Sequence, residues 1–281
     1  MYGPTLLHGA VRDQQREVTM LFADLRGFTE LTSSLVTDPL FCELLSHVMD
    51  CLTDAVMHHD GFIIDFYGDG LMAMWNAPSD QPQHQELACR AGLRILDTLP
   101  NVANEWTRLI HSDLRIGIGL HTGTVLVGNA GSTQRVKFGV RGPNVHLASR
   151  VEAATKELRL PLLATQATVE GISDSLASNR VCRARMPGVH RPVDLYAVSS
   201  RDDEATQMLA WQCYRNALHY FEQGRFQDVV DTLAKIDASA TGVPVQFLTE
   251  RVQQELGREL RRRSTDPVSN GTSGIIAINA K

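Results

Sequence analysis

The sequence predicts an α/β domain built on a mixed sheet, followed by a shorter helical extension. Three observations carry this prediction: a β-prone, almost continuously apolar run over residues 17–23, later pairs of apolar runs joined by turn residues, and helix-like periodicity between them. Strands that alternate with helices and hairpins are typical of a mixed α/β sheet. Near residues 199–204 the pattern changes to helical spacing alone.

The first half of the chain divides into elements of distinct period. The apolar run at its start suits a strand buried on both faces, and apolar residues spaced three to four apart then predict an amphipathic helix. Gly68-Asp69-Gly70 separates two apolar runs, which is a strong hairpin signal. The elements are a leader over 1–16, a strand over 17–23, a helix over 41–56, strands over 61–67 and 71–75, and a helix over 87–99.

The second half continues the alternation. A second β-pair is predicted from two runs, 114–123 and 124–129, and in the first of them Gly117 and Gly119 alternate with apolar residues. Such glycines often let another backbone or a ligand approach closely. The remaining elements are a strand over 136–140, a helix over 144–158, and strands over 160–165, 181–186 and 192–198.

The last part of the chain is predicted to be helical. Its apolar residues follow helix spacing in three segments, and the first two resemble one tetratricopeptide-type hairpin. The alternative, that these helices simply pad the first domain, is equally compatible with the pattern. The predicted divisions are a leader over 1–16, the α/β domain over 17–200, the helical extension over 205–262 and a mobile tail over 263–281.

Composition excludes several classes of protein. The chain has 281 residues, 43% of them apolar and 21% charged, which is enough apolar content for a packed core. Its net charge of −5 is opposite to the basic footprint of nucleic-acid binders. No apolar run approaches the ~18–20 residues that a transmembrane helix needs. The five cysteines are scattered without a Cys-x-x-Cys pair, so we expect a reduced, cytoplasmic protein without a disulfide framework or a zinc site.

Two aspartates are candidates for metal binding. Asp24 directly follows the first buried strand, and Asp69 lies at the tip of the predicted hairpin. In an α/β sheet these positions can meet at one edge, and Mg²⁺ typically takes one or two carboxylates together with water and phosphate oxygens. Each residue also has a purely structural interpretation, Asp69 as a turn former and Asp24 as a helix N-cap.

Four blocks of sequence resemble a known family in order and spacing. They are LFADLRGFTEL, GFIIDFYGDGLMAMW, LRIGIGLHTGTVLVGNAGS and RVKFGVRGPNVHLASRVEAAT, and together they resemble the catalytic domain of class III nucleotidyl (adenylate/guanylate) cyclases over about residues 14–200. The resemblance implies a ferredoxin-like βαββαβ core. It also implies a head-to-tail dimer with active sites at the interface, and attack of a ribose 3′-oxygen on the α-phosphorus with release of pyrophosphate.

The resemblance also assigns roles to individual residues. Asp24 and Asp69 match the pair that holds two divalent ions, Mg²⁺ or Mn²⁺, and Arg150 matches the arginine that offsets charge in the transition state. The backbone through Gly27, Phe28 and Thr29 would approach the nucleotide phosphates at a helix N-terminus, where free N–H groups suit an anion.

Four positions depart from the family pattern. Asp65 replaces a purine-reading lysine, Gly139 replaces its partner, His146 replaces a ribose-orienting asparagine, and Pro187 replaces a phosphate-gripping lysine. Asp65 can accept a hydrogen bond from a purine amine but cannot donate to guanine O6, and it is otherwise a solvated acid. His146 shares a helix face with Arg150 and is either a substitute for the asparagine or a packing residue. Three arginines are candidates to replace the missing lysine: Arg183, Arg185 and Arg191.

We therefore predict an enzyme that cyclises ATP or GTP as a homodimer. Two alternatives stay open at this point. In one, the chain is the metal-holding half of a heterodimer, because its metal pair is intact while its purine-reading positions are altered. In the other, it is a catalytically silent nucleotide-binding module whose C-terminal helices dock a protein partner.

Overall fold

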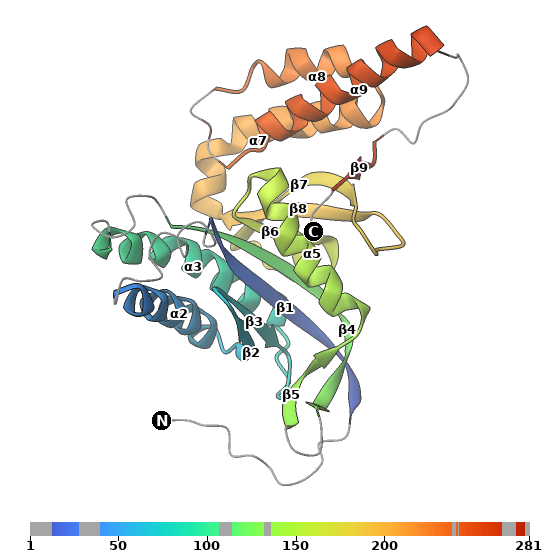
Figure 1. The fold of residues 1–281 in the computed structure, drawn as a ribbon. Coiled ribbons are helices and arrows are strands. Elements are labelled where there is room, and N and C mark those ends of the chain that lie inside the picture. Colours follow the sequence, from blue (N-terminus) through green and yellow to red (C-terminus); the bar gives the residue numbers. More distant parts are fainter. Residues whose placement is uncertain are drawn as a thin grey trace.

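A mixed β-sheet runs through the part of the chain that the computed structural model describes (Figure 1). The described residues are 13–27, 40–106, 114–131, 136–237, 240, 242–265 and 274–278. The strands are β1 (Gln14–Arg26), β2 (Phe62–Tyr67), β3 (Gly70–Trp75), β4 (Arg115–Gly131), β5 (Val136–Arg141), β6 (Leu162–Thr165), β7 (Leu176–Arg185), β8 (Val193–Ser200) and β9 (Ile276–Ala277). Within the described residues they form a nine-stranded sheet in the order β2-β3-β1-β4-β6-β8-β7-β9, with β5 paired to β4 off this path.

Helices cover both faces of this sheet, and a further helical layer lies beside its β7 end (Figure 1). Helices α2 and α3 share a core with one face of β1, and α5 packs on the opposite face. In the described ranges, no helix is both long and apolar enough to cross a bilayer. The helices are α2 (Leu40–His58), α3 (His84–Glu105), α5 (Pro143–Leu158), α6 (Gln166–Val169), α7 (Arg201–Glu222), α8 (Phe226–Leu233) and α9 (Val245–Thr265).

Strand β1 is an interior strand of the sheet, with a partner on each side. It lies antiparallel to β3 and to β4, with Asp24 opposite Gly70 on one side and Gly117 on the other. Side chains alternate between the faces, so Leu21 and Ala23 join the core under α2 and α3 whereas Met20 joins the core on the opposite face. This double burial confirms the expected strand at the start of the domain.

The prediction of two separate strands within residues 114–129 is wrong. Residues 114–123 and 124–129 were expected to form two strands, but β4 is one continuous strand of 17 residues. It pairs with β1 along its length, from Gln14 opposite Val127 to Arg26 opposite Arg115. The hairpin partner of β4 is β5. The small residues in the middle of the run thus allow close approach of another element without forming a turn.

That close approach is made by α5, which crosses β4 over its glycines. A Cβ atom added to Gly119 would lie 2.1 Å from the backbone nitrogen of Glu152, and one added to Gly117 would overlap the Arg26 guanidinium. A side chain at Gly119 would therefore need a backbone shift, and one at Gly117 would have to displace the Arg26 and Thr155 side chains. The glycines of β4 therefore fix how near α5 lies to the strand that carries Asp24.

Helices α7, α8 and α9 form what we call the helical unit, residues 201–265. It follows β8 directly, with Ser200 capping α7 by accepting from the Asp203 N–H at 3.1 Å. Its apolar residues, Trp211 and Phe247 among them, share one buried core with α5 and β7. The helices are thus packed on the sheet domain rather than separated from it.

The end of the predicted mobile tail is ordered, which corrects that expectation. Strand β9 pairs in parallel with β7, and the Ile278 N–H donates to the Arg185 carbonyl at 3.0 Å. Ile276 and Ile278 are 3% and 1% exposed. Burial of these two side chains favours pairing of β9 with β7, although most of the residues in the tail are polar. Residues 266–273 and 279–281, like the leader residues 1–12, lie outside the described residues.

Candidate active site

Two carboxylates come together at the end of β1. Asp24 stands opposite Gly70, and Asp69 precedes that glycine in the turn between β2 and β3. A Cβ atom added to Gly70 would lie 2.9 Å from Asp24 Oδ1, so the glycine leaves the space that this carboxylate uses. The structure brings the two aspartates together at the end of the strands, as expected.

The environment of this pair disfavours two negative charges. Burial raises the pKa of Asp24 above its ordinary value, although the neighbouring Arg26 guanidinium opposes the shift. Burial, followed by the charge of Asp24, raises the pKa of Asp69 to about 6. A cation placed between the carboxylates would relieve both effects.

Tyr67 holds the turn that carries Asp69. Its hydroxyl is directed at the Leu71 carbonyl at 3.1 Å and at the Ala23 carbonyl at 3.3 Å. Its ring lies 5.9 Å from that of Phe22, centroid to centroid. The tyrosine thus ties the β2–β3 turn to β1 on the strand segment that presents Asp24.

Arg26 connects the same strand to α5. Its Nη2 donates to Glu152 Oε1 at 2.7 Å and to the Glu152 carbonyl at 3.2 Å, and it also contacts Thr155 Oγ1. Burial raises the pKa of Glu152 to about 7, with Arg26 opposing the shift. The guanidinium therefore stabilises the ionised form of two acids, Asp24 on its own strand and Glu152 on the helix.

Arg150 and His146 come from a different element than the two aspartates. Both lie on α5, where His146 is exposed and Arg150 is half-buried. The aspartates lie on β1 and in the turn between β2 and β3. The candidate catalytic residues are thus supplied by a helix and by the end of the sheet.

Asp65 has a cationic partner that the sequence reasoning missed. Lys137 on β5 places its Nζ 2.5 Å from Asp65 Oδ2, with about half of each side chain exposed. Next to this ion pair, Phe138 packs edge-on against Phe62 with a centroid distance of 5.6 Å. Strand β5 thus reaches back to β2, although β3, β1 and β4 separate the two in the sheet order.

The family of the chain follows from comparison with known proteins. The adenylate and guanylate cyclase catalytic domain matches residues 11–198, which include the aspartate pair, Asp65 and the α5 residues. The chain belongs to this cyclase family. The helical unit lies outside the match, as the sequence resemblance indicated.

Individual relatives include cyclases of both kinds. The chain is 33% identical over 186 residues to adenylate cyclase 1 of Rhizobium meliloti and 28% identical over 189 residues to an adenylate cyclase of Anabaena cylindrica. Each match covers 66% of this chain but only 28% and 37% of those relatives, respectively. Among solved structures, the guanylyl cyclase Cya2 is 32% identical with a TM-score of 0.58, covering 67% of this chain and 94% of that one. The adenylyl cyclase CyaB of P. aeruginosa is 28% identical with a TM-score of 0.60, covering 68% and 99%.

The structure describes one of the two predicted phosphate-binding segments in full and the other only in part. Gly27 ends β1 with a positive φ of 74°, whereas Phe28 and Thr29 lie outside the described residues. Pro187 and Gly188 form an exposed turn after β7. The three arginines named as substitutes for the missing lysine are all exposed: Arg183, Arg185 and Arg191.

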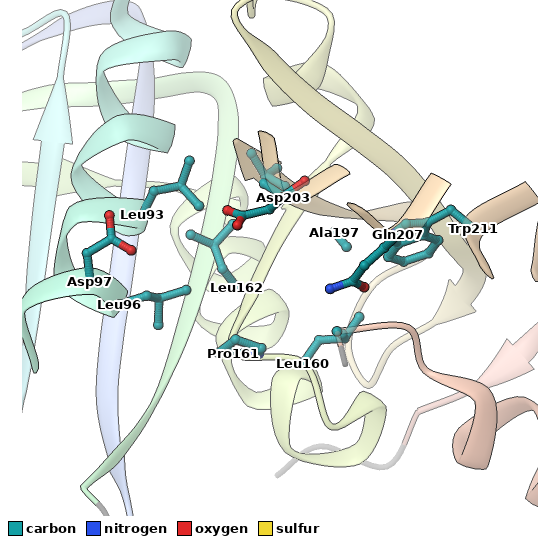
Figure 2. Close-up of a pocket in the computed structure, with 13 residues that line it drawn as sticks. Leu93, Leu96, Asp97, Leu160, Pro161, Leu162, Ala197, Asp203, Gln207 and Trp211 are labelled. Atoms are coloured by element: carbon teal, nitrogen blue, oxygen red, sulfur yellow. The ribbon is translucent and has the colours of Figure 1, made fainter. Parts of the chain in front are cut away.

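A cavity of about 260 Å³ lies elsewhere, between the cyclase domain and the helical unit. Figure 2 shows Leu93 and Asp97 of α3 on one side, Leu162 of β6 between, and Gln207 and Trp211 of α7 on the other. None of the predicted site residues lines it. The cavity therefore marks the junction of the two parts of the chain and is separate from the candidate active site.

The sequence contains only a weak signal for Lys137 as the partner of Asp65. Lys137 lies two positions before Gly139 on the same strand, so both side-chain positions face the same way. Packing does not itself require a glycine at position 139, because a Cβ atom there would lie at an ordinary contact distance of 3.4 Å from Ile64 Cγ2. A lysine at this spacing indicates a partner for Asp65 only once β5 is known to reach β2.

Proposed function

We propose that this chain forms a 3′,5′-cyclic monophosphate from ATP or GTP and releases pyrophosphate. The ribose 3′-oxygen forms a bond to the α-phosphorus, the bond from that phosphorus to the pyrophosphate oxygen breaks, and the proton of the 3′-hydroxyl passes to solvent. The observation that carries the proposal is the pairing of Asp24 with Asp69 at the end of β1, in a chain of the cyclase family.

The carboxylate pair suits Mg²⁺ or Mn²⁺, which we propose as cofactors, two for each site. Within the described ranges, metal-ligating side chains do not gather in groups of three or more, so the donor set offered here is the two carboxylates. Mg²⁺ commonly takes one or two carboxylates and completes its shell with water and substrate phosphates. Ions bound there would polarise the reacting phosphate and offset its charge.

The proposed working form is a head-to-tail homodimer. Arg150 lies on α5, whereas the carboxylates lie on β1 and in the β2–β3 turn, and we propose that a complete site takes that arginine from a second copy. A guanidinium delivered in this way would offset charge that develops on the transferred phosphoryl group. His146, four residues earlier on the same helix face, would donate to a ribose oxygen. A heterodimer with a different cyclase chain is the alternative arrangement.

We further propose that Asp65 and Lys137 read the purine edge together. The carboxylate accepts and the ammonium donates, which answers the limitation that Asp65 alone cannot donate to guanine O6. Adenine offers a donor at N6 and an acceptor at N1, whereas guanine offers an acceptor at O6 and a donor at N1. The position of each charge then decides which purine fits, and relatives of both specificities are similar to this chain.

Exchanging the two charges is therefore expected to reverse the nucleotide preference. In the double variant Asp65→Lys/Lys137→Asp, the ratio of kcat/KM for ATP to that for GTP should move by about tenfold or more toward the other purine, because a matched pair of hydrogen bonds is worth ~1–3 kcal/mol. Steady-state kinetics with both nucleotides measure this ratio. Lys235→Asp, an exposed lysine on the helical unit, is the control. An active double variant with the original preference would contradict the assignment.

The proposed activity is tested directly on the purified chain. We expect a cyclic nucleotide and pyrophosphate from ATP or GTP with Mg²⁺ or Mn²⁺, and no product when a chelator removes the metal. Calorimetry with each nucleotide accompanies the assay. Tight nucleotide binding without turnover would favour the silent module, and turnover only after a second cyclase chain is added would favour the heterodimer.

A further inference from the structure

Helix α5 lies between the proposed active site and the helical unit. His146 and Arg150 are on its exposed or half-exposed side, and its other side is fully buried. Three of the buried residues join a core with α7 and α9. The members of this core that concern us are Val151, Ala154 and Leu158 of α5, Trp211 and Tyr214 of α7, and Phe247 and Leu248 of α9.

Polar contacts join the end of α5 to α9 in addition to this core. The Arg251 guanidinium pairs with the Glu157 carboxylate. Arg159 donates through Nη1 to Gln246 Oε1 at 2.6 Å and through Nη2 to Glu250 Oε1 at 2.7 Å. Two arginines, one from each helix, thus bind acids on the other.

The Arg251–Glu157 pair is less exposed than a typical surface ion pair. The two side chains are 18% and 25% exposed, and the Arg251 guanidinium also lies over the Phe247 ring at 5.3 Å from its centroid. Exposed pairs contribute little because water screens them and both side chains lose freedom. Partial burial and stacking reduce both losses, so this pair can fix a geometry.

The backbone at the end of α5 is also set by these contacts. Arg159 has a φ of 56°, in the left-handed region that residues other than glycine rarely adopt, and its N–H still closes the helix on the Thr155 carbonyl. Its side chain leaves the helix there and reaches α9. The last turn of α5 is therefore shaped to meet the helical unit.

The distance from these contacts to the candidate catalytic arginine is short. Arg150 and Glu157 are seven residues apart, which is about two helical turns, or roughly 10 Å, along nearly the same side of α5. A rigid helix transmits a displacement at one end over such a distance. A shift of about 1 Å in a catalytic group can cost about 100-fold in rate.

We propose that α9, through Arg251 and through its contacts with Arg159, positions α5 and thereby Arg150 and His146 for the reaction. The catalytic part of this inference rests on the proposed function. The helical unit is then a positioning element of the active site, and any partner or ligand that moved it would change turnover.

Charge reversal across the Arg251–Glu157 pair tests the proposal in the full chain. We expect Arg251→Glu and Glu157→Arg each to lower kcat about tenfold while KM for the nucleotide and Mn²⁺ binding stay within twofold. The double variant restores the pair in reversed polarity and should recover kcat to within about twofold. Arg225→Glu is the control, because Arg225 pairs with Asp228 of α8, away from the contacts between α5 and α9, and its replacement should leave kcat unchanged.

Hydrogen exchange supplies a measurement that does not depend on cyclase activity. Amides of residues 143–158 should exchange several-fold faster in each single variant and return to the original rate in the double variant, while amides of α2 stay unchanged. Folded single variants with unaltered kcat and unaltered α5 exchange would overturn the proposal, as would a double variant that rescues neither. If the chain lacks cyclase activity altogether, the proposed function fails while the exchange data still decide whether α9 positions α5.

Discussion

Replacing Asp24 or Asp69 by alanine is expected to lower cyclic nucleotide formation by at least about 1000-fold. Each carboxylate supplies half of the proposed metal-binding donor set, and charge stabilisation by bound metal is worth several kcal/mol, of which about 4 kcal/mol corresponds to 1000-fold. The fold should persist, because burial already makes ionisation of both groups unfavourable. Product formation and a circular dichroism melt of Asp24→Ala and Asp69→Ala measure the two effects.

The control for this prediction is Asp97→Ala, which removes an exposed aspartate of α3 that is remote from the pair. Full activity is expected there. Retained turnover in both Asp24→Ala and Asp69→Ala would contradict the proposed role of the two carboxylates in binding metal. Loss of activity accompanied by loss of the melting transition would mean that the carboxylates are structural instead.

Metal binding by the same pair carries a characteristic dependence on pH. Because the pKa of Asp69 is raised to about 6, the carboxylate that a cation needs is lost as pH falls through 6, well above the range of an ordinary aspartate. Mn²⁺ affinity measured by calorimetry should therefore fall between about pH 7 and 5. Without metal, the raised pKa favours the folded protein at low pH, and this contribution to stability is lost as pH rises from about 4 through 6.

Replacing Arg150 by alanine is expected to lower kcat about 100- to 1000-fold, the usual loss when one transition-state donor is removed. Metal binding should be unchanged because hard divalent cations take oxygen ligands and a guanidinium supplies none. In a head-to-tail dimer the arginine and the aspartates at one site come from different copies. Kinetics of Arg150→Ala alone therefore cannot separate the dimer from a single-chain site, and a mixing experiment is required.

Mixed dimers of Arg150→Ala and Asp24→Ala chains supply that experiment. If the two copies exchange freely, half of the dimers are mixed and each of those has one intact site of two, so the equimolar mixture should regain about a quarter of the unmodified activity. Mixing Asp24→Ala with Asp69→Ala is the control, because both changes fall in the same half of the site. A mixture of Arg150→Ala and Asp24→Ala that stays inactive would argue against the homodimer.

Local patterns in the sequence predicted much of the fold. The apolar run at the start is strand β1, Gly68-Asp69-Gly70 marks the β2–β3 turn, and the three-to-four spacing of apolar residues is that of α2. The error over β4 has a physical cause. The predicted boundary follows Gly123, and a glycine can signal either a turn or a close contact. Only the position of α5 distinguishes the two, because a Cβ atom on Gly123 would lie 2.7 Å from Asn144 Nδ2.

The sequence by itself determined the order of most elements and the identity of the metal-binding candidates, because strand period, helix period and turn chemistry act between residues that are near in the chain. Tertiary structure decided which distant residues meet. Lys137 reaches Asp65, α9 reaches the end of α5, and the last strand pairs with β7. These contacts depend on how strands reach across the sheet and how helices pack, and such long-range geometry leaves no periodic signal in a single sequence.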